Sequence, residues 1–210
     1  LLDTGDVSTV ELADDGELIV FNRQLSSAQP ELWSINTDGS GERRLIDAAQ
    51  FATMRTEIPA PDGVGIYQMG WIPGTHTLAF NTGVFYNAGL YINVADDLWT
   101  LNVDTGELLN LLPRGAGGEF LYSPDGTQIA IMTPDSLSLI NADGSNRRDS
   151  VLESFEAIGF GEYYAFPQVM WSNDSRALWL VVNAAENPYA QHDGAVTVWS
   201  LDSQTLKTQE

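Results

Sequence analysis

The sequence predicts an all-β fold made of four repeated units, each a four-stranded antiparallel sheet. Three observations support this prediction. Turns rich in Asp, Asn and Gly interrupt the chain too often for long amphipathic helices. A short apolar segment follows the first turn of each unit. A second apolar segment leads into a second turn at a nearly constant spacing. Repetition of this kind over a whole chain is the mark of a repeat architecture.

The two hairpins of each unit are located by their turns. Asp-Gly and related pairs supply the positive φ that tight hairpins require. The first turns with their following strands are residues 14–21, 73–80, 123–131 and 172–180. The apolar segments that open the second hairpins are residues 32–35, 98–101, 137–140 and 198–201. The units therefore cover approximately residues 1–50, 64–112, 117–152 and 165–210.

The strand after each first turn is apolar at successive positions rather than at alternate ones, as in Leu18, Ile19, Val20 and Phe21. Such a strand is expected to be buried on both faces. Four-stranded sheets that bury both faces by stacking radially are the blades of a β-propeller. We therefore predict a single propeller domain or segment with four four-stranded antiparallel blades.

The third unit carries the most specific turn. The run Ser123-Pro124-Asp125-Gly126, its apolar strand and a later Asn-x-Asp-Gly turn resemble the repeat of TolB-like propellers. The repeat is also similar to that of the propeller domains of prolyl-oligopeptidase-like peptidases. The other three units depart from the Ser-Pro-Asp-Gly pattern. TolB-like arrays form larger rings, so the resemblance implies that these four blades belong to a larger ring whose further blades come from the same or another chain. The start at Leu1 without Met is also expected for a segment of a longer protein. The resemblance further implies an extracytoplasmic protein (periplasmic, cell-surface or secreted).

Charge is the most pronounced compositional feature. Nine Lys and Arg oppose 29 Asp and Glu, for a formal net charge of -20. Nucleic acid and anionic lipid surfaces repel such a chain, so a basic protein or peptide is the partner that charge favours. The acids are scattered, and solubility alone would also explain them. The chain has no cysteine and no apolar run long enough to span a membrane, so membrane insertion is not expected.

The length of the connections varies on one side of the repeat only. The interval from the first turn to the third strand ranges from 12 to 25 positions, and that from the second turn to the next first turn ranges from 20 to 35. From the third strand to the second turn the interval is 6 or 7. Strand alternation places both variable connections at one edge, where long loops on a rigid scaffold commonly bind partners.

These insertions are rich in aromatic residues, which suit recognition surfaces. Aromatic side chains of long loops also fold back and pack, and for any one residue packing is the simpler interpretation. The candidates for contact with a partner are Tyr86, Tyr91, Phe155, Tyr163, Tyr164, Tyr189 and His192.

No pattern of catalytic or metal-binding residues is found in the sequence. There is no Gly-x-Ser-x-Gly elbow and no paired-histidine zinc motif, and His76 falls in a turn. We therefore predict no enzyme activity, no catalytic or metal-ligating residues and no cofactor. Structural calcium at the adjacent acids Asp14-Asp15 or Asp96-Asp97 is kept as a minor alternative, although solvated turn residues explain them as well.

The sequence thus favours a non-catalytic binding or scaffold propeller that recognises a protein or peptide through aromatic loops on one face. Two alternatives stay open. The chain is an accessory propeller that gates a serine hydrolase domain found elsewhere, or it is a structural component of a cell-surface assembly.

Overall fold

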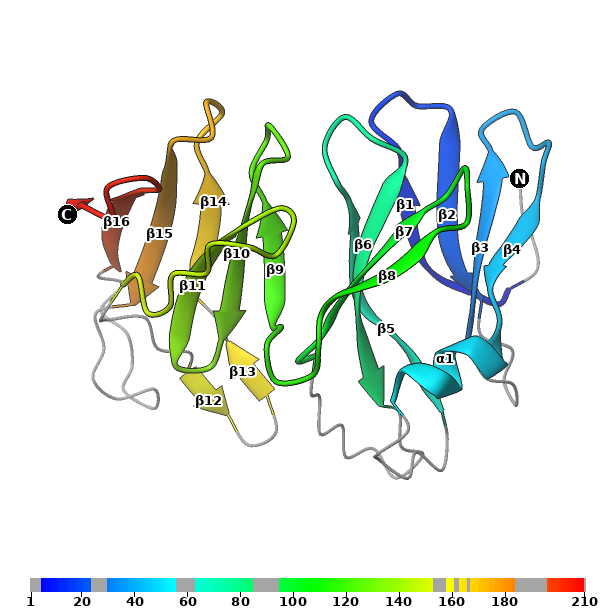
Figure 1. The fold of residues 1–210 in the computed structure, drawn as a ribbon, viewed down its shortest axis with the longest axis horizontal. Helices are drawn as coiled ribbons and strands as arrows, with labels where there is room; N and C mark the ends of the chain where they lie inside the picture. The colour runs from blue at the N-terminus through cyan, green and yellow to red at the C-terminus, as the bar shows by residue number, and fades with distance from the viewer. Residues whose placement is uncertain are drawn as a thin grey trace. The chain divides into compact units, whose positions relative to one another are not determined.

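The computed structural model describes residues 5–23, 30–55, 63–84, 95–152, 158–160, 163–165, 167–183 and 196–209. The chain divides into two compact units, unit 1 (Leu1–Gly118) and unit 2 (Glu119–Glu210). Unit 1 contains two four-stranded antiparallel sheets, and unit 2 contains a three-stranded, a two-stranded and a four-stranded one (Figure 1).

Unit 1 contains two four-stranded sheets. The first blade has the strand order β1-β2-β3-β4, with bounds Val7–Leu12, Leu18–Arg23, Glu31–Asn36 and Arg43–Ile46. The second blade has the order β5-β6-β7-β8, with bounds Val64–Trp71, Thr77–Val84, Leu98–Asn102 and Leu108–Leu112. Helix α1, Ala48–Met54, connects the two blades and belongs to the first insertion.

Unit 2 departs from the predicted pattern in two places. The third blade has three strands, β9 (Glu119–Tyr122), β10 (Gln128–Thr133) and β11 (Ser136–Asn141), and its fourth strand is represented by the single bridge between Leu139 and Arg148. An additional hairpin, β12 (Ile158–Phe160) with β13 (Tyr163–Ala165), stands where a loop was expected. The fourth blade has the order β14-β15-β16-β17, with bounds Gln168–Trp171, Ala177–Asn183, Val196–Asp202 and Thr208–Gln209.

The two tight turns of each blade lie at the same edge, as the spacing predicted. In all four blades a backbone N–H of the second turn donates to a carbonyl of the first turn at 2.8 or 2.9 Å: Thr37 to Glu17, Val103 to His76, Ala142 to Thr127 and Ser203 to Arg176. We call this edge the turn edge and the opposite one the loop edge. The variable connections of each unit leave from its loop edge.

Each unit buries its core between its two blades. Directly opposed residues of antiparallel strands share a face, so the register sorts every blade into two faces. The face that packs on the preceding blade is called the leading face, and the other the trailing face. In unit 1 the leading face of the second blade comprises Met69, Trp71, Leu78, Phe80, Trp99 and Leu101. It packs on the trailing face of the first blade, formed by Leu18, Val20, Leu32 and Ile46.

Unit 2 repeats this arrangement with the same positions. The leading face of the fourth blade comprises Val169, Trp171, Leu178, Leu180, Trp199 and Leu201. It packs on Leu121, Ala130, Met132, Leu137 and Leu139 of the third blade. The second strand of each blade is apolar at successive positions because its residues point in turn to the leading face and to the trailing face.

Candidate functional site at the loop edge

The predicted contact residues fall mostly outside the described part of the chain. Tyr86, Tyr91, Phe155, Tyr189 and His192 lie outside the described residues.

Tyr163 and Tyr164 belong to β13, where Tyr163 pairs with Phe160 and Tyr164 with Gly159. Their side chains lie outside the description, so the structure fixes only their place in a hairpin. The described residues from which two of the insertions emerge therefore carry the structural argument.

The first insertion begins with a short capped helix. Asp47 accepts a hydrogen bond from the Gln50 amide at 2.9 Å, and the Gln50 side chain accepts one from the Asp47 amide at 3.0 Å, which completes a capping box. Phe51 and Met54 of this helix are buried. The Phe51 ring meets Phe80 edge-on at 6.4 Å between ring centres. This insertion aromatic is therefore a core residue.

Arg55 ends the helix and is the largest fully buried side chain of the described residues, at 2% exposure. Its Nε donates to Thr82 Oγ1 at 2.6 Å, and its Nη2 donates to the Thr82 carbonyl at 2.6 Å. The same Nη2 donates to Asp96 Oδ1 at 2.9 Å and lies 3.6 Å from Asp97 Oδ1. A buried guanidinium is tolerated only with such pairing, because burying a lone charge is costly.

Asp97 is the second buried charge, with a side chain 1% exposed. Its Oδ1 accepts from the Thr82 amide at 2.8 Å. Its Oδ2 accepts from Thr82 Oγ1 at 2.5 Å and from Trp99 Nε1 at 3.0 Å. The Thr82 hydroxyl therefore accepts from Arg55 and donates to Asp97, which links the two charges through one side chain.

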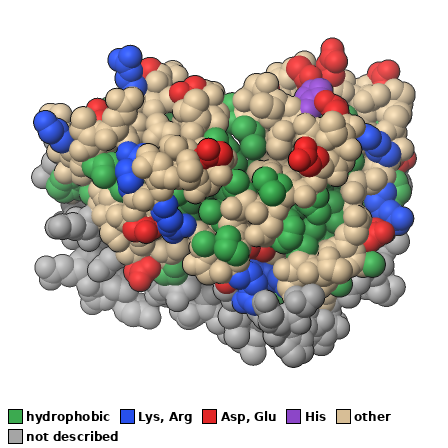
Figure 2. Space-filling view, viewed as in Figure 1, with side chains coloured by type: hydrophobic (Ala, Val, Ile, Leu, Met, Phe, Trp, Pro, Cys, Tyr) green, Lys and Arg blue, Asp and Glu red, His purple; other side chains and the backbone are tan. Residues whose placement is uncertain are grey.

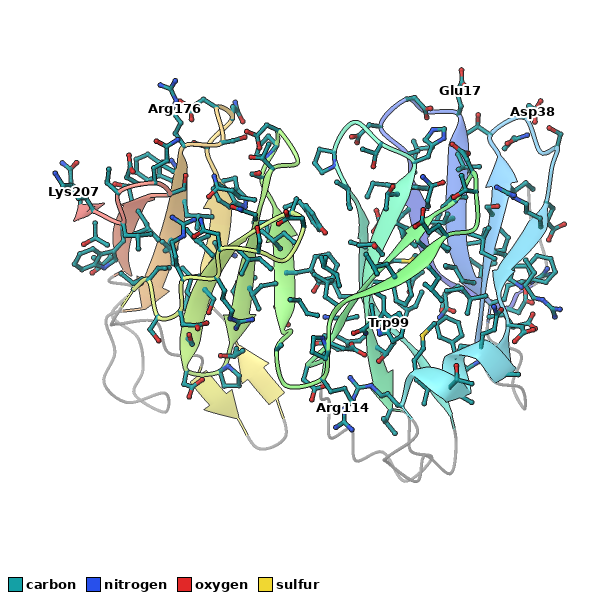
Figure 3. All side chains as sticks on the ribbon, viewed as in Figure 1. Glu17, Asp38, Trp99, Arg114, Arg176 and Lys207 are labelled. Carbon is teal, nitrogen blue, oxygen red and sulfur yellow. The ribbon has the colours of Figure 1, made fainter. Side chains whose placement is uncertain are left out.

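The cluster reaches the surface through Asp96 and Arg114. Their side chains are 23% and 30% exposed, and Arg114 Nε lies 3.7 Å from Asp96 Oδ1. Figure 3 shows Arg114 at the end of unit 1 opposite to Glu17 and Asp38, which lie on turns. The Asp96 carbonyl accepts from the Gly117 amide at 2.7 Å. A Cβ on Gly117 would lie 2.3 Å from the Asp97 carbonyl oxygen, so no larger residue fits there.

The position of this loop-edge cluster (Arg55, Thr82, Asp96, Asp97 and Arg114) suggests its role. Arg55 is the last described residue before 56–62. Thr82 and Asp96 stand near the two ends of the insertion that carries Tyr86 and Tyr91. Two arginines and two aspartates balance, so the cluster has no formal net charge. Its hydrogen bonds and ion pairs join the last described residue before 56–62 to residues at both ends of the insertion that carries Tyr86 and Tyr91.

The turn edge of unit 1 carries the described histidine. His76 Nε2 lies 2.7 Å from Asp15 Oδ2 of the first blade, and Nδ1 lies 3.1 Å from Asp104 Oδ2 of the second. In Figure 2 acidic side chains (red) surround the histidine (purple) at this edge. Hydrogen bonding to Asp15 first, and then to Asp104, raises the pKa of His76 above its ordinary 6.5. The expected turn position of His76 is confirmed.

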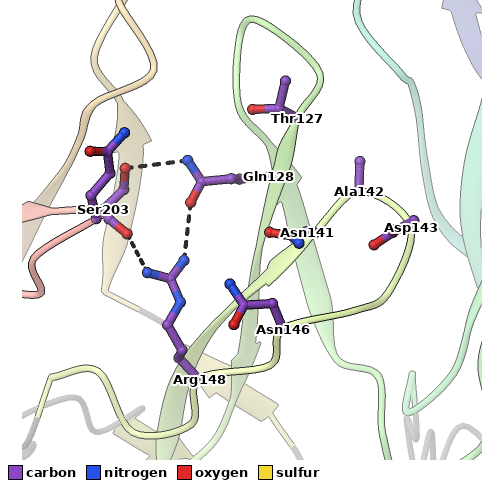
Figure 4. A pocket seen from close by; sticks show the side chains of 9 residues that line it. Thr127, Gln128, Asn141, Ala142, Asp143, Asn146, Arg148 and Ser203 are labelled. Carbon is purple, nitrogen blue, oxygen red and sulfur yellow. Dashed lines mark hydrogen bonds between the residues drawn. The ribbon is translucent and has the colours of Figure 1, made fainter.

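Unit 2 has an open hollow of about 670 Å³ at its turn edge (Figure 4). Its most basic side chain is Arg148, whose Nη1 donates to the Ser203 carbonyl at 2.5 Å and whose Nη2 donates to Gln128 Oε1 at 3.1 Å. Unit 1 has the equivalent bond, from Arg43 Nη2 to the Val103 carbonyl at 2.5 Å. Because this bond recurs at equivalent positions of both units, Arg148 is a structural residue that connects two neighbouring blades. Its place in the hollow is therefore explained without a ligand.

The acidic pairs considered as calcium ligands are engaged by protein groups. Asp14 accepts from the Gly74 amide at 3.0 Å and Asp15 contacts His76, while Asp96 and Asp97 contact Arg55. Within the described ranges, no group of three or more His, Cys, Asp or Glu side chains is arranged to hold a metal ion. In the same residues, no helix is long and apolar enough to cross a membrane.

Comparisons with known proteins bear on the fold. No family model matches the sequence, and no curated protein matches it. A puromycin hydrolase structure has a TM-score of 0.60 at 17% identity, covering 100% of this chain and 29% of that chain. TolB from Acinetobacter baumannii has a TM-score of 0.55 at 12% identity, covering 94% and 42%. The structure of an oligogalacturonate lyase in complex with manganese has a TM-score of 0.61 at 17% identity, covering 97% of this chain and 53% of that chain.

These likenesses confirm the resemblance to TolB and to the propeller domains of prolyl-oligopeptidase-like peptidases. At such identities they show the fold alone. The chain spans between about a third and about half of the length of these structures, so the activities in their names belong to those proteins.

Proposed function

We propose that this chain is a non-catalytic binding propeller of an extracytoplasmic protein, which recognises a protein or peptide through the loops of its loop edge. The loop-edge cluster is the observation that supports this most directly. Buried ion pairs add little net stability compared with apolar packing, and the fixed geometry that they impose is what this one contributes. Here that geometry sets the ends of two insertions, one of which carries Tyr86 and Tyr91.

A basic partner fits the charge of the chain. The net charge of -20 attracts cationic segments and speeds their encounter at low salt. Aromatic side chains would supply the contact area, and the negative charge of the chain would orient the basic partner.

Selection from a random peptide library on the immobilised chain tests this proposal. We expect the enriched peptides to contain an excess of Lys and Arg and to bind more weakly as salt rises. Tyr86→Ala and Tyr164→Ala should each weaken a selected peptide by about fivefold or more, as expected for an aromatic contact worth over about 1 kcal/mol. Glu17→Gln at the turn edge is the matched control. No enrichment, or loop variants that bind unchanged, would contradict the proposal.

The second candidate is an accessory propeller that gates a hydrolase. The likeness to puromycin hydrolase over 100% of this chain is the observation that favours it. Sequencing the native source protein decides between the two, because a linked segment with a Gly-x-Ser-x-Gly elbow followed by Asp and His would favour the hydrolase.

A further inference from the structure

The hollow at the turn edge of unit 2 is lined almost entirely by polar side chains (Figure 4). Among the described residues that line it, Ala142 is the single apolar one, and none is aromatic. The others carry amides, hydroxyls and one charge of each sign: Thr127, Gln128, Asn141, Asp143, Asn146, Arg148, Ser203 and Gln204. Its volume of about 670 Å³ lies within the range of small-molecule sites, about 300–1,000 Å³. Such sites are mostly apolar, so a ligand of this one must itself be polar.

Unit 1 has apolar residues at two of the equivalent positions. The turn hydrogen bonds that recur in the blades align Leu18 with Gln128 and Val103 with Ser203. In unit 1 both residues belong to the core, Leu18 at 8% exposure and Val103 at 0%. In unit 2 the Gln128 Nε2 instead donates to Ser203 Oγ at 3.3 Å. Apolar packing between two blades is thus replaced by a polar contact, and this contact forms part of the lining of the hollow.

The acidic groups of unit 1 are also replaced in unit 2. Glu17 aligns with Thr127, and Asp104 with Gln204, through the same turn hydrogen bonds. Although the chain has a net charge of -20, neutral residues at both positions leave the lining with one acid and one base. The base, Arg148, already donates to two protein oxygens. The lining therefore has no excess of charge to attract an anion or a cation, and it favours an uncharged ligand.

Two side-chain amides of the lining, those of Asn146 and Gln204, form no hydrogen bond within the part of the chain that the structure describes. Asn146 has a φ of 52°, and unit 1 has Gly41 at this position with a φ of 68°. Asparagine is tolerated in this left-handed conformation, but glycine adopts it without steric cost. The turn geometry therefore does not require an amide here.

We propose that this hollow binds a neutral saccharide. Each side-chain amide offers two donors on its NH2 group and an acceptor on its carbonyl oxygen. Sugar hydroxyls both donate and accept, so they match Asn146 and Gln204, which are the residues that contact the sugar. Without an aromatic side chain for stacking, we expect a dissociation constant in the millimolar range. The site lies at the turn edge and does not depend on the function proposed for the loop edge.

Nuclear magnetic resonance of the isotope-labelled full chain tests the proposal by titration with glucose, maltose, cellobiose and lactose. The side-chain NH2 signals of Asn146 and Gln204 should move with at least one of these sugars. Asn173 is the matched control, because it is an exposed turn residue of unit 2 that does not line the hollow, and its signal should stay in place. No movement of either lining amide with any of these sugars would overturn the proposal.

Two variants of the lining test which residues contact the sugar. Asn146→Gly restores the residue of unit 1, so its thermal midpoint should change little while the amide is lost. It should weaken binding by about fivefold or more, and Gln204→Ala should do the same, as expected for one lost hydrogen bond. Asn173→Ala should bind the sugar with unchanged affinity. Unchanged affinity of both lining variants would also overturn the proposal.

The charge of the ligand is tested with salt and with glucuronate, the acidic counterpart of glucose. Binding of a neutral sugar should not change as salt rises, whereas peptides bound at the loop edge should weaken. Tighter binding of glucuronate than of every neutral sugar would contradict a neutral saccharide site. Movement of the Asn146 signal by a selected basic peptide would contradict it too, because the hollow would then be a peptide site.

Discussion

Asp97→Asn at the loop-edge cluster should destabilise unit 1 strongly. The carboxylate accepts three hydrogen bonds, two on Oδ2 and one on Oδ1, and lies 3.6 Å from the Arg55 guanidinium. An amide has one acceptor oxygen. If that oxygen takes the place of Oδ2, the amide NH2 faces the Thr82 N–H, and two donors oppose each other in a buried site.

The magnitude follows from burial. The Asp97 side chain is 1% exposed and that of Arg55 0% exposed, so water does not replace the lost acceptor. A buried unsatisfied group costs about 1–3 kcal/mol. Removing one partner of a buried ion pair costs about 3–5 kcal/mol in total. We therefore expect a loss of about 3–5 kcal/mol in the free energy of unfolding of unit 1. Asp96→Asn, whose side chain is 23% exposed and keeps an acceptor for Arg55, should cost only about 1–2 kcal/mol.

Native-state hydrogen exchange of the β6 and β7 amides in rising urea measures the stability of unit 1 separately from unit 2. The double variant Arg55→Met with Asp97→Asn completes a double-mutant cycle, which measures the interaction energy between the two residues. Because it removes both charges, it should cost less than the sum of the single losses by about 1–3 kcal/mol. A loss below about 1 kcal/mol for Asp97→Asn, or additivity within about 0.5 kcal/mol, would refute the interpretation of the cluster as one coupled unit.

Three further predictions concern unit 1. Gly117→Ala should cost about 1–3 kcal/mol, because its Cβ would meet the Asp97 carbonyl oxygen at 2.3 Å, while Gly70→Ala, with no atom within 4 Å, should be near neutral in the same urea titration. Phe51→Ala should cost about 3–5 kcal/mol in that titration, because the ring is 0% exposed; a loss under about 1 kcal/mol would contradict its place in the core. His76→Gln should lower the thermal midpoint at pH 5.5–6.5 and have a smaller effect as the pH rises. The raised pKa makes the stabilisation complete below the unfolded value near 6.5, and it is lost as the pH rises through the higher folded pKa. An effect that grows with pH would have the wrong sign.

The scaffold could be predicted from the sequence because each of its rules acts locally and recurs. Turn chemistry fixed the hairpins, and successive apolar positions, as in Leu18 and Ile19, indicated strands with a neighbour on either side. The errors occur where local rules are weak. The fourth strand of the third blade is a single bridge at Arg148, and helix α1 and the hairpin β12–β13 occupy insertions that have no repeated counterpart.

The loop-edge cluster could be predicted only in part. The adjacent acids Asp96 and Asp97 indicated a cation site in the sequence, and the cation that the structure places there is the Arg55 guanidinium. The available signal was composition. In a chain with 9 basic and 29 acidic residues, an acid is the most available charged partner for any arginine, Arg55 included. Its partner was beyond reach, because Asp96 lies 41 residues away and pairs through tertiary contact alone.

Comparison of equivalent positions in the blades distinguishes side-chain contacts that recur from contacts found in one blade alone. The indole of Trp33 donates to Glu31 at 3.0 Å, and that of Trp99 donates to Asp97 at 3.0 Å from the same blade position. The first and second blades therefore share a carboxylate two residues before this tryptophan, whereas the fourth blade has Thr197 two residues before Trp199. The buried contact of Arg55 with that carboxylate has no such counterpart in the first blade, where the Glu31 carboxylate meets the half-exposed Arg44. This buried contact is therefore particular to the second blade, where it lies next to residues 56–62 and to the insertion that carries Tyr86 and Tyr91.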